Sequence, residues 1–89
     1  MRVRVKVYGM VQGVGFRYYV AEVARSSQLK GWVRNLDYGS IEILLDGAEA
    51  DVNYAFEMCK KGPPAASVRR VQVTLEDDSV PLSGFRIAF

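Results

Sequence analysis

Hydrophobic and polar residues alternate at the start of the chain. Over residues 2–8 the valines at every second position face one way, and the basic residues between them face the other. Such period-two alternation of β-branched residues is typical of a half-buried strand. The strand ends at Gly9, and residues 9–15 form a loop punctuated by glycines. From Phe16 to about residue 27 the apolar residues recur at helical spacing, which predicts a helix.

The rest of the chain continues to switch between strand and helix patterns. Residues 30–34 and 41–45 have strand character, and their closeness predicts a β-hairpin with a turn over residues 35–39. A second helix is predicted over residues 48–60, where Gly62 and the two prolines after it provide a stop signal. A fourth strand begins near residue 67. A short final strand carries the alternating residues Phe85, Ile87 and Phe89.

This order of elements predicts a fold class. The arrangement βαββαβ plus a short C-terminal strand favours an α+β fold, a ferredoxin-like sandwich with two helices on one face of a mostly antiparallel sheet. We expect the core strand order 4-1-3-2, and the pattern leaves the place of the fifth strand open. With 89 residues, no internal repeat and no linker, residues 1–89 are expected to form a single domain.

Charge and composition limit the kinds of binding partner and the cellular location that we expect for the protein. Twelve basic and ten acidic residues give a net charge of +2, which is weak support for a polyanionic partner, so no nucleic-acid partner is expected. No apolar run approaches the roughly 20 residues that span a bilayer. No signal-peptide pattern is visible either. We therefore expect a cytoplasmic protein that does not bind a membrane, and we expect it to be a monomer.

Histidine is absent, and Cys59 is the one cysteine. The chain therefore lacks the usual general base near neutral pH and the commonest metal ligand. A structural zinc site is not expected on the same grounds, and neither is any other metal or a cofactor. Cys59 fits a buried position on the second helix and is interpreted as structural.

The glycine loop is the stretch most informative about chemistry. Glycines allow positive φ, so that successive N–H groups at the start of a helix can converge on one anion. Arg17 lies in the first helical turn, where its guanidinium can bind phosphate oxygens with two hydrogen bonds. Without further information, a plain glycine-rich connector beside a surface arginine explains the pattern equally well. The nucleotide fingerprints GxGxxG and GxxxxGK are both absent.

Two sequence motifs resemble the acylphosphatase family. The string VYGMVQGVGFR at residues 7–17 looks like the first signature of that family, and GWVRN at residues 31–35 looks like its second. Residues 62–68 are similar to a third block, so the resemblance spans essentially the whole chain. It implies a metal-independent hydrolase that acts on acid anhydrides in phosphorus-containing compounds. Such an enzyme cleaves the carboxyl-phosphate bond of small acyl phosphates and releases a carboxylate and inorganic phosphate.

The resemblance also assigns roles to individual residues. The phosphate-binding arginine of the family maps to Arg17, and its catalytic asparagine, which orients the attacking water, maps to Asn35. The backbone amides that hold the phosphoryl oxygens map to the loop and first helical turn, namely Gln12, Gly13, Val14, Gly15, Phe16 and Arg17. Considered without the resemblance, an asparagine at a strand end is more often a turn residue than a catalytic one. Phe16 and Trp32 are expected in the core.

The sequence departs from the family pattern at two turns. Where the family places glycine before the second strand, this chain has Gln28, which would then need a left-handed backbone as a helix cap. In the turn between the second and third strands, Tyr38 stands before Gly39 in place of aspartate, so we expect a different shape at this turn.

Two other functions remain open at this point. One is a binding module that holds phosphate or carbamoyl phosphate without turnover, as in the N-terminal domain of a larger hydrogenase maturation protein, although the short chain favours a free-standing enzyme. The other is RNA binding, because RNA-recognition domains share this element order. The third strand, however, carries no aromatic residue, which disfavours an RNA-binding sheet.

Overall fold

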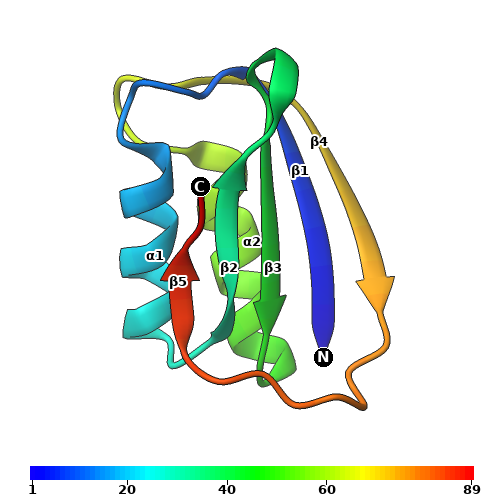
Figure 1. Ribbon diagram of the computed structural model, residues 1–89. Helices are drawn as coiled ribbons and strands as arrows, with labels where there is room; N and C mark the ends of the chain where they lie inside the picture. The colour runs from blue at the N-terminus through cyan, green and yellow to red at the C-terminus, as the bar shows by residue number, and fades with distance from the viewer.

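Two helices cover one face of a five-stranded sheet in the computed structural model, which describes residues 1–89 (Figure 1). The elements in chain order are β1 (Arg2–Met10), α1 (Phe16–Ser26), β2 (Lys30–Asn35), a short 3₁₀ turn (Asp37–Gly39), β3 (Ile41–Asp46), α2 (Glu49–Lys61), β4 (Ser67–Glu76) and β5 (Phe85–Ile87). The predicted ferredoxin-like α+β fold is therefore confirmed. Neither helix is both long enough and apolar enough to cross a membrane.

The strands lie in the order β4-β1-β3-β2-β5. This confirms the predicted core order and places the fifth strand beside β2. The contacts of β1 with β3 and β4, and of β2 with β3, are antiparallel, whereas β2 and β5 run parallel. The prediction that Phe89 belongs to the last strand is wrong, because β5 ends at Ile87. Pairing of β5 with β2 involves only three residues of each strand.

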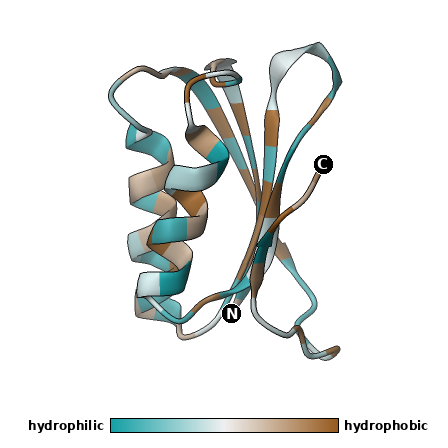
Figure 2. Cartoon of the chain, turned by 60° about the vertical axis from the view of Figure 1, so that its left-hand side comes forward, coloured by the Kyte–Doolittle hydropathy of each residue, from teal (hydrophilic) through white to brown (hydrophobic).

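The core lies between the helices and the sheet, where the hydrophobic residues of both layers face each other (Figure 2). Val5 and Val7 of β1 are completely buried, as are Ile43 and Leu45 of β3. Each fully buried aliphatic side chain of this size contributes about 1.5–3 kcal/mol to folding. From the helices, the core receives residues at the predicted spacing: Phe16, Val20 and Ala24 of α1, and Val52, Ala55 and Cys59 of α2. Burial raises the pKa of the Cys59 thiol to about 12, which keeps this group protonated and unreactive.

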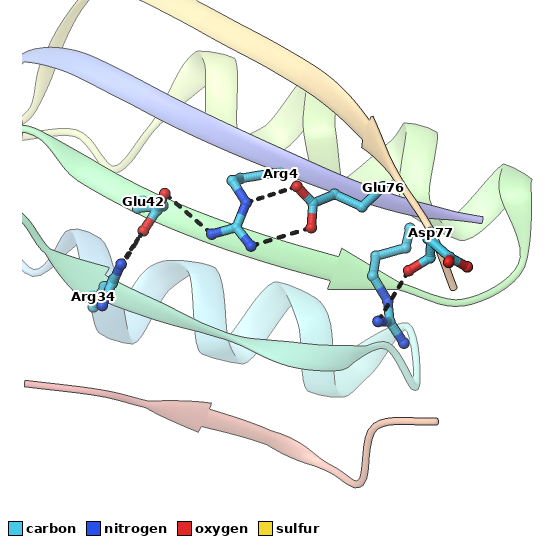
Figure 3. Close-up of polar contacts among 6 residues, drawn as sticks. Arg4, Arg34, Glu42, Glu76 and Asp77 are labelled. Atoms are coloured by element: carbon cyan, nitrogen blue, oxygen red, sulfur yellow. Dashed lines mark hydrogen bonds and ion pairs between the residues drawn. The ribbon is translucent and has the colours of Figure 1, made fainter. Parts of the chain in front are cut away.

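A row of ion pairs crosses the opposite face of the sheet (Figure 3). Arg34 of β2 donates to Glu42 of β3 with an Nη2–Oε1 distance of 2.6 Å. Arg4 of β1 lies 3.2 Å from the other oxygen of Glu42 and also donates to Glu76 of β4. Glu42 is only 4% exposed. The row thus links four adjacent strands, and it fixes the end of β2 next to Asn35.

Trp32 lies on this ion-pair face, and the prediction that it belongs to the core is wrong. Its ring is within 5.4 Å of the Arg4 guanidinium and 5.0 Å of the Arg34 guanidinium. Successive side chains of a strand point to opposite faces of the sheet. Val33, the neighbour of Trp32, points toward the helices and is fully buried, so Trp32 points to the other face. Trp32 packs between two cations instead, an arrangement that the electron-rich faces of its ring favour.

The end of α1 requires a left-handed residue, and that residue is Gln28. Its φ is 57°, its N–H donates to Arg25 O at 3.1 Å, and the next N–H, of Leu29, donates to Ala24 O at 2.8 Å. These two bonds form a Schellman motif, in which glycine is the usual left-handed residue. The expectation of a left-handed cap at Gln28 is therefore confirmed.

The turn between β2 and β3 contains a second left-handed side chain. Tyr38 has φ 66° and is fully exposed, and the N–H of Leu36 donates to Ser40 O at 2.8 Å across the turn. The connection is a 3₁₀ turn rather than a two-residue hairpin. Tyr38 therefore occupies a conformation that glycine or asparagine adopts at lower cost.

We predict that Gln28→Gly raises the free energy of unfolding by about 1 kcal/mol, because it relieves the left-handed strain at this cap. Thermal and urea unfolding of the variant and wild type measure the difference. Ser27→Gly is the matched control, since Ser27 has φ −96° and glycine there only adds flexibility to the unfolded chain. A loss of stability in Gln28→Gly equal to that in Ser27→Gly would contradict the cap assignment.

The ion-pair row predicts an acid-sensitive contribution to stability. Burial raises the pKa of the Glu42 carboxyl, but hydrogen bonds from Arg34 and Arg4 outweigh it, so this pKa lies below its usual value of 4.5. The unfolded chain therefore binds this proton more tightly than the native one. The contribution of Glu42 is present above about pH 4.5 and is lost as the pH falls through the lowered pKa.

Accordingly, Glu42→Gln should destabilise the protein by about 1–3 kcal/mol at pH 7 and weaken the fall in stability below pH 4.5. Urea unfolding at a series of pH values measures both effects. Glu57→Gln removes the same charge from an exposed helix position and serves as the control. If the two variants show the same acid limb as wild type, Glu42 does not carry this pH dependence.

Candidate active site

A small open cavity lies where β1 passes through the glycine loop into α1, at the upper end of the sheet in Figure 1. Its volume is about 100 Å³, and it is lined by Val11, Gln12, Gly13, Gly15, Phe16, Arg17, Tyr18 and Asn35. Pockets for drug-sized ligands usually hold about 300–1,000 Å³. The cavity is therefore suited to a group the size of phosphate and not to a whole nucleotide.

The fold thus brings most of the predicted site residues together. Arg17 and Asn35 come from different elements, α1 and the end of β2, and both line the cavity. Val14 is the one predicted loop residue that does not line it. Its side chain is half-buried and packs against the hydrophobic core. This packing anchors the middle of the loop to the core.

The backbone of the loop alternates in handedness. Gly13 has φ 74° and Gly15 has φ 77°, whereas Val14 between them has no positive φ. Successive residues of opposite handedness turn their N–H groups toward one concave side, a geometry known to bind anions. A Cβ atom built on Gly13 or Gly15 would meet nothing within 4 Å. The two glycines are therefore required by their backbone angles and not by a lack of space.

The amides of this segment have no partner within the protein. Among the backbone hydrogen bonds outside the regular elements, only the N–H of Tyr19 reaches the loop, where it donates to Gly15 O at 3.0 Å. The N–H groups of residues 12–18 donate no hydrogen bond to the chain, and Gly15 provides no side-chain cap for α1. Unpaired amides at the positive end of a helix dipole favour a bound anion.

Arg17 is held by the segment that follows β5. Its Nη1 donates to Ala88 O at 3.2 Å, and its guanidinium lies 4.9 Å from the centre of the Phe89 ring. One carbonyl occupies only a part of the five N–H donors of a guanidinium, so the others are free for a ligand. The sequence does not predict this contact. No local sequence pattern indicates it, because Arg17 and Ala88 are 71 residues apart in the chain.

The Asn35 carboxamide makes no hydrogen bond within the protein and is half-buried at the end of β2. Its free amide can both donate to and accept from a bound water. Beside it, the Gln12 side chain donates from Nε2 to Leu36 O at 2.8 Å and to Ser40 O at 2.9 Å. Gln12 therefore ties the glycine loop to the turn that follows Asn35. The sequence predicts only the backbone amide of Gln12 as part of the site, and this side-chain role was not expected.

Several known proteins are similar to this chain in sequence and in fold. The sequence model of the family described as acylphosphatase matches residues 3–87. The acylphosphatase of Moorella thermoacetica is 46% identical over 86% of this chain and 83% of the relative. The crystal structure of the Bacillus subtilis acylphosphatase is 39% identical, with a TM-score of 0.95 over 99% of this chain and 98% of that one. Full-length HypF in its phosphate- and nucleotide-bound form is 31% identical, with a TM-score of 0.87 over 99% of this chain but 12% of that protein.

We predict that Gly15→Ala weakens binding of inorganic phosphate at least about tenfold, because a left-handed alanine costs roughly 1–2 kcal/mol and the loop relaxes away from the anion-binding geometry. Isothermal titration with phosphate measures the loss. Gly84→Ala is a closely matched control, since Gly84 has φ 66°, has equally open space around its Cβ position and lies outside the cavity. Equal phosphate affinity in both variants would show that the loop geometry does not determine binding.

Proposed function

The chain belongs to the acylphosphatase family, and we propose that the loop amides and Arg17 hold the phosphoryl group of an acyl phosphate while Asn35 orients the attacking water. As a member of this family, the protein is a hydrolase that acts on small acyl phosphates. The observation that carries the residue assignment is the small cavity in which unpaired amides, a guanidinium and a free carboxamide meet.

Phosphate binding follows from the number of donors directed at one small volume. A hydrogen bond to a charged group is worth roughly 1.5–3 kcal/mol net. Several loop amides together with the Arg17 guanidinium can therefore bind the phosphoryl oxygens without a metal ion. The site is preorganised, because glycine backbone angles, the Gln12 side chain and the Ala88 carbonyl position its parts before the substrate arrives.

The reaction needs little beyond positioning and charge stabilisation. The water oxygen attacks phosphorus, the bond from phosphorus to the carboxylate oxygen breaks, and the carboxylate leaves with the electron pair. Because the leaving group is a weak base, it requires no protonation. Negative charge on the equatorial oxygens of the transferring group is stabilised by the amides and by Arg17.

Asn35 holds the water in line with the breaking bond, since its carboxamide can accept one water proton and donate to the water oxygen. None of the residues lining the cavity is a carboxylate, a histidine or a cysteine. The water proton is therefore transferred to a phosphoryl oxygen of the substrate itself, and the products are the carboxylate and protonated inorganic phosphate. A pH–rate profile with an essential enzyme base near neutrality would contradict this step.

Two broader features belong to the same proposal. Residues 1–89 form a single acylphosphatase-like domain, supported by the one hydrophobic core. The enzyme acts in the cytoplasm without a cofactor, and the buried free thiol of Cys59 suits a reducing compartment.

Benzoyl phosphate hydrolysis by alanine variants tests the assignment of the two side chains. Arg17→Ala should weaken competitive inhibition by inorganic phosphate by about 10–100-fold and lower turnover, because it removes a charged donor from the ground state and the transition state. Asn35→Ala should lower kcat by about 10²–10³-fold and change phosphate inhibition little, because it removes only the orientation of the water.

Exposed residues of the same type provide the controls. Arg86→Ala and Asn53→Ala remove the same functional groups outside the cavity and should retain wild-type kinetics. Normal activity in both site variants would refute the residue assignment. If the wild-type protein binds phosphate but hydrolyses no benzoyl phosphate above background, the chain is a binding module instead.

A further inference from the structure

Strand β4 forms a long open edge of the sheet. It pairs with β1 on one side only, and the opposite edge of the sheet is the three-residue strand β5. Residues 71–75 in its centre carry no charge, proline or glycine. Val73 is 50% exposed and Leu75 is 72% exposed. Natural proteins rarely leave such an edge uncovered, because its free N–H and C=O groups pair readily with another strand.

The sequence of β4 is complementary to itself around Val73. When two copies of the strand are paired antiparallel with Val73 opposite Val73, residues 70–76 all meet suitable partners. Gln72 lies opposite Thr74, Val71 opposite Leu75, and Arg70 opposite Glu76. Cross-strand pairs of like polarity and opposite charge each stabilise a sheet by a few tenths to about 1 kcal/mol. The next pair outward, Arg69 with Asp77, has opposite charges as well.

Two neighbouring registers of the same pairing are less favourable. Centring the pair on Gln72 places Arg69 opposite Leu75 and Glu76 opposite Val68. A shift by a single residue places Arg70 opposite Leu75 and also turns the helix layers of the two copies to opposite faces. Charge complementarity therefore selects the register centred on Val73.

An apolar groove lies beside this edge on the helix side. It has a volume of about 250 Å³ between β4 and α2, and Val73 and Leu75 form its outer wall with Phe56 of α2 opposite them. In the selected register, Val71 of a second copy lies next to Leu75 of the first. Val73 of the second copy lies next to Val73 of the first, and both pairs are at the mouth of this groove. Pairing would thus cover apolar surface in addition to the main-chain groups.

The charged residues near the two ends of β4, Arg70 and Glu76, can each form a further ion pair. Glu76 accepts hydrogen bonds from Arg4, but a carboxylate has about four acceptor sites, so a second arginine can also bind it. The guanidinium of Arg70 lies 4.3 Å from the ring centre of Tyr8 and makes no ion pair within the chain.

We propose that β4 pairs antiparallel with β4 of a second copy of this chain and forms an isologous dimer with one continuous ten-stranded sheet. This replaces the expectation of a monomer drawn from the sequence alone. The strands β1 and β3 separate β4 from β2, which carries Asn35, so the pairing leaves that side of the cavity uncovered.

Sedimentation velocity over a hundredfold range of concentration tests the oligomeric state. The wild-type chain should shift from monomer toward dimer and no further, because an isologous contact is closed. Val73→Lys places two like charges at the two-fold axis and should give a monomer with wild-type activity per chain. Val80→Lys makes the same change at an exposed loop position and should dimerise as wild type does.

Disulfide trapping tests the register. Under mild oxidation Val73→Cys should form a covalent dimer, because residue 73 meets itself across the axis. Leu75→Cys alone should not, whereas a mixture of Leu75→Cys and Val71→Cys should cross-link as a heterodimer. The buried native thiol of Cys59 does not compete.

A wild-type chain that remains monomeric over the whole concentration range would overturn the proposal. A dimer that survives Val73→Lys, and in which Val73→Cys cross-links no better than Leu75→Cys, would overturn it equally, since that dimer would use another surface.

Discussion

The site depends on one constraint, that the backbone amides of residues 12–18 have no hydrogen-bond partner inside the protein. Unpaired amides at a helix N-terminus form a favourable site for an anion. Two left-handed glycines maintain this geometry, and neither is packed so tightly that a side chain would collide. The fold thus leaves these donors free for the phosphoryl group of the proposed substrate.

The strand order explains how the second half of the site reaches this loop. β1 and β2 are not neighbours, because β3 lies between them. The glycine loop therefore passes over the beginning of β3 toward the turn after Asn35, and the Gln12 side chain closes the gap with two hydrogen bonds to that turn. On the outer face of the sheet, the Arg34–Glu42 pair fixes the same end of β2. These contacts hold the glycine loop and Asn35 in place relative to each other, although they take no part in the proposed reaction.

The small number of chemical groups in this site is consistent with the reaction of the family. An acyl phosphate carries a good leaving group, so hydrolysis needs an anion-binding site and an oriented water more than it needs a strong acid or base. A chain without histidine, whose one thiol is buried, can therefore be an acylphosphatase. In the proposed mechanism arginine, asparagine and main-chain amides are sufficient, because they supply the positioning and charge stabilisation that this reaction needs.

The order of the elements and the helix-facing residues of β1 were evident from the sequence, because both are encoded within short windows of alternating or helical spacing. The glycine loop by itself was equally consistent with a plain connector, and only the family resemblance assigned it to phosphate. The left-handed residue at position 28 followed from the family pattern, which places a glycine there. Asn35 became a site residue only through the family resemblance, since an isolated asparagine at a strand end carries no distinctive pattern.

Only the tertiary structure decided the rest. The parallel pairing of β5 with β2 brings Ala88 and Phe89 to Arg17, and the alternation of β2 moves Trp32 out of the core and between two arginines. These contacts join residues that are distant in sequence, and they exist because layers and strands pack in one particular order. Local periodicity determines which face of an element is buried, but the neighbours that each side chain meets are set by the packing of the whole chain.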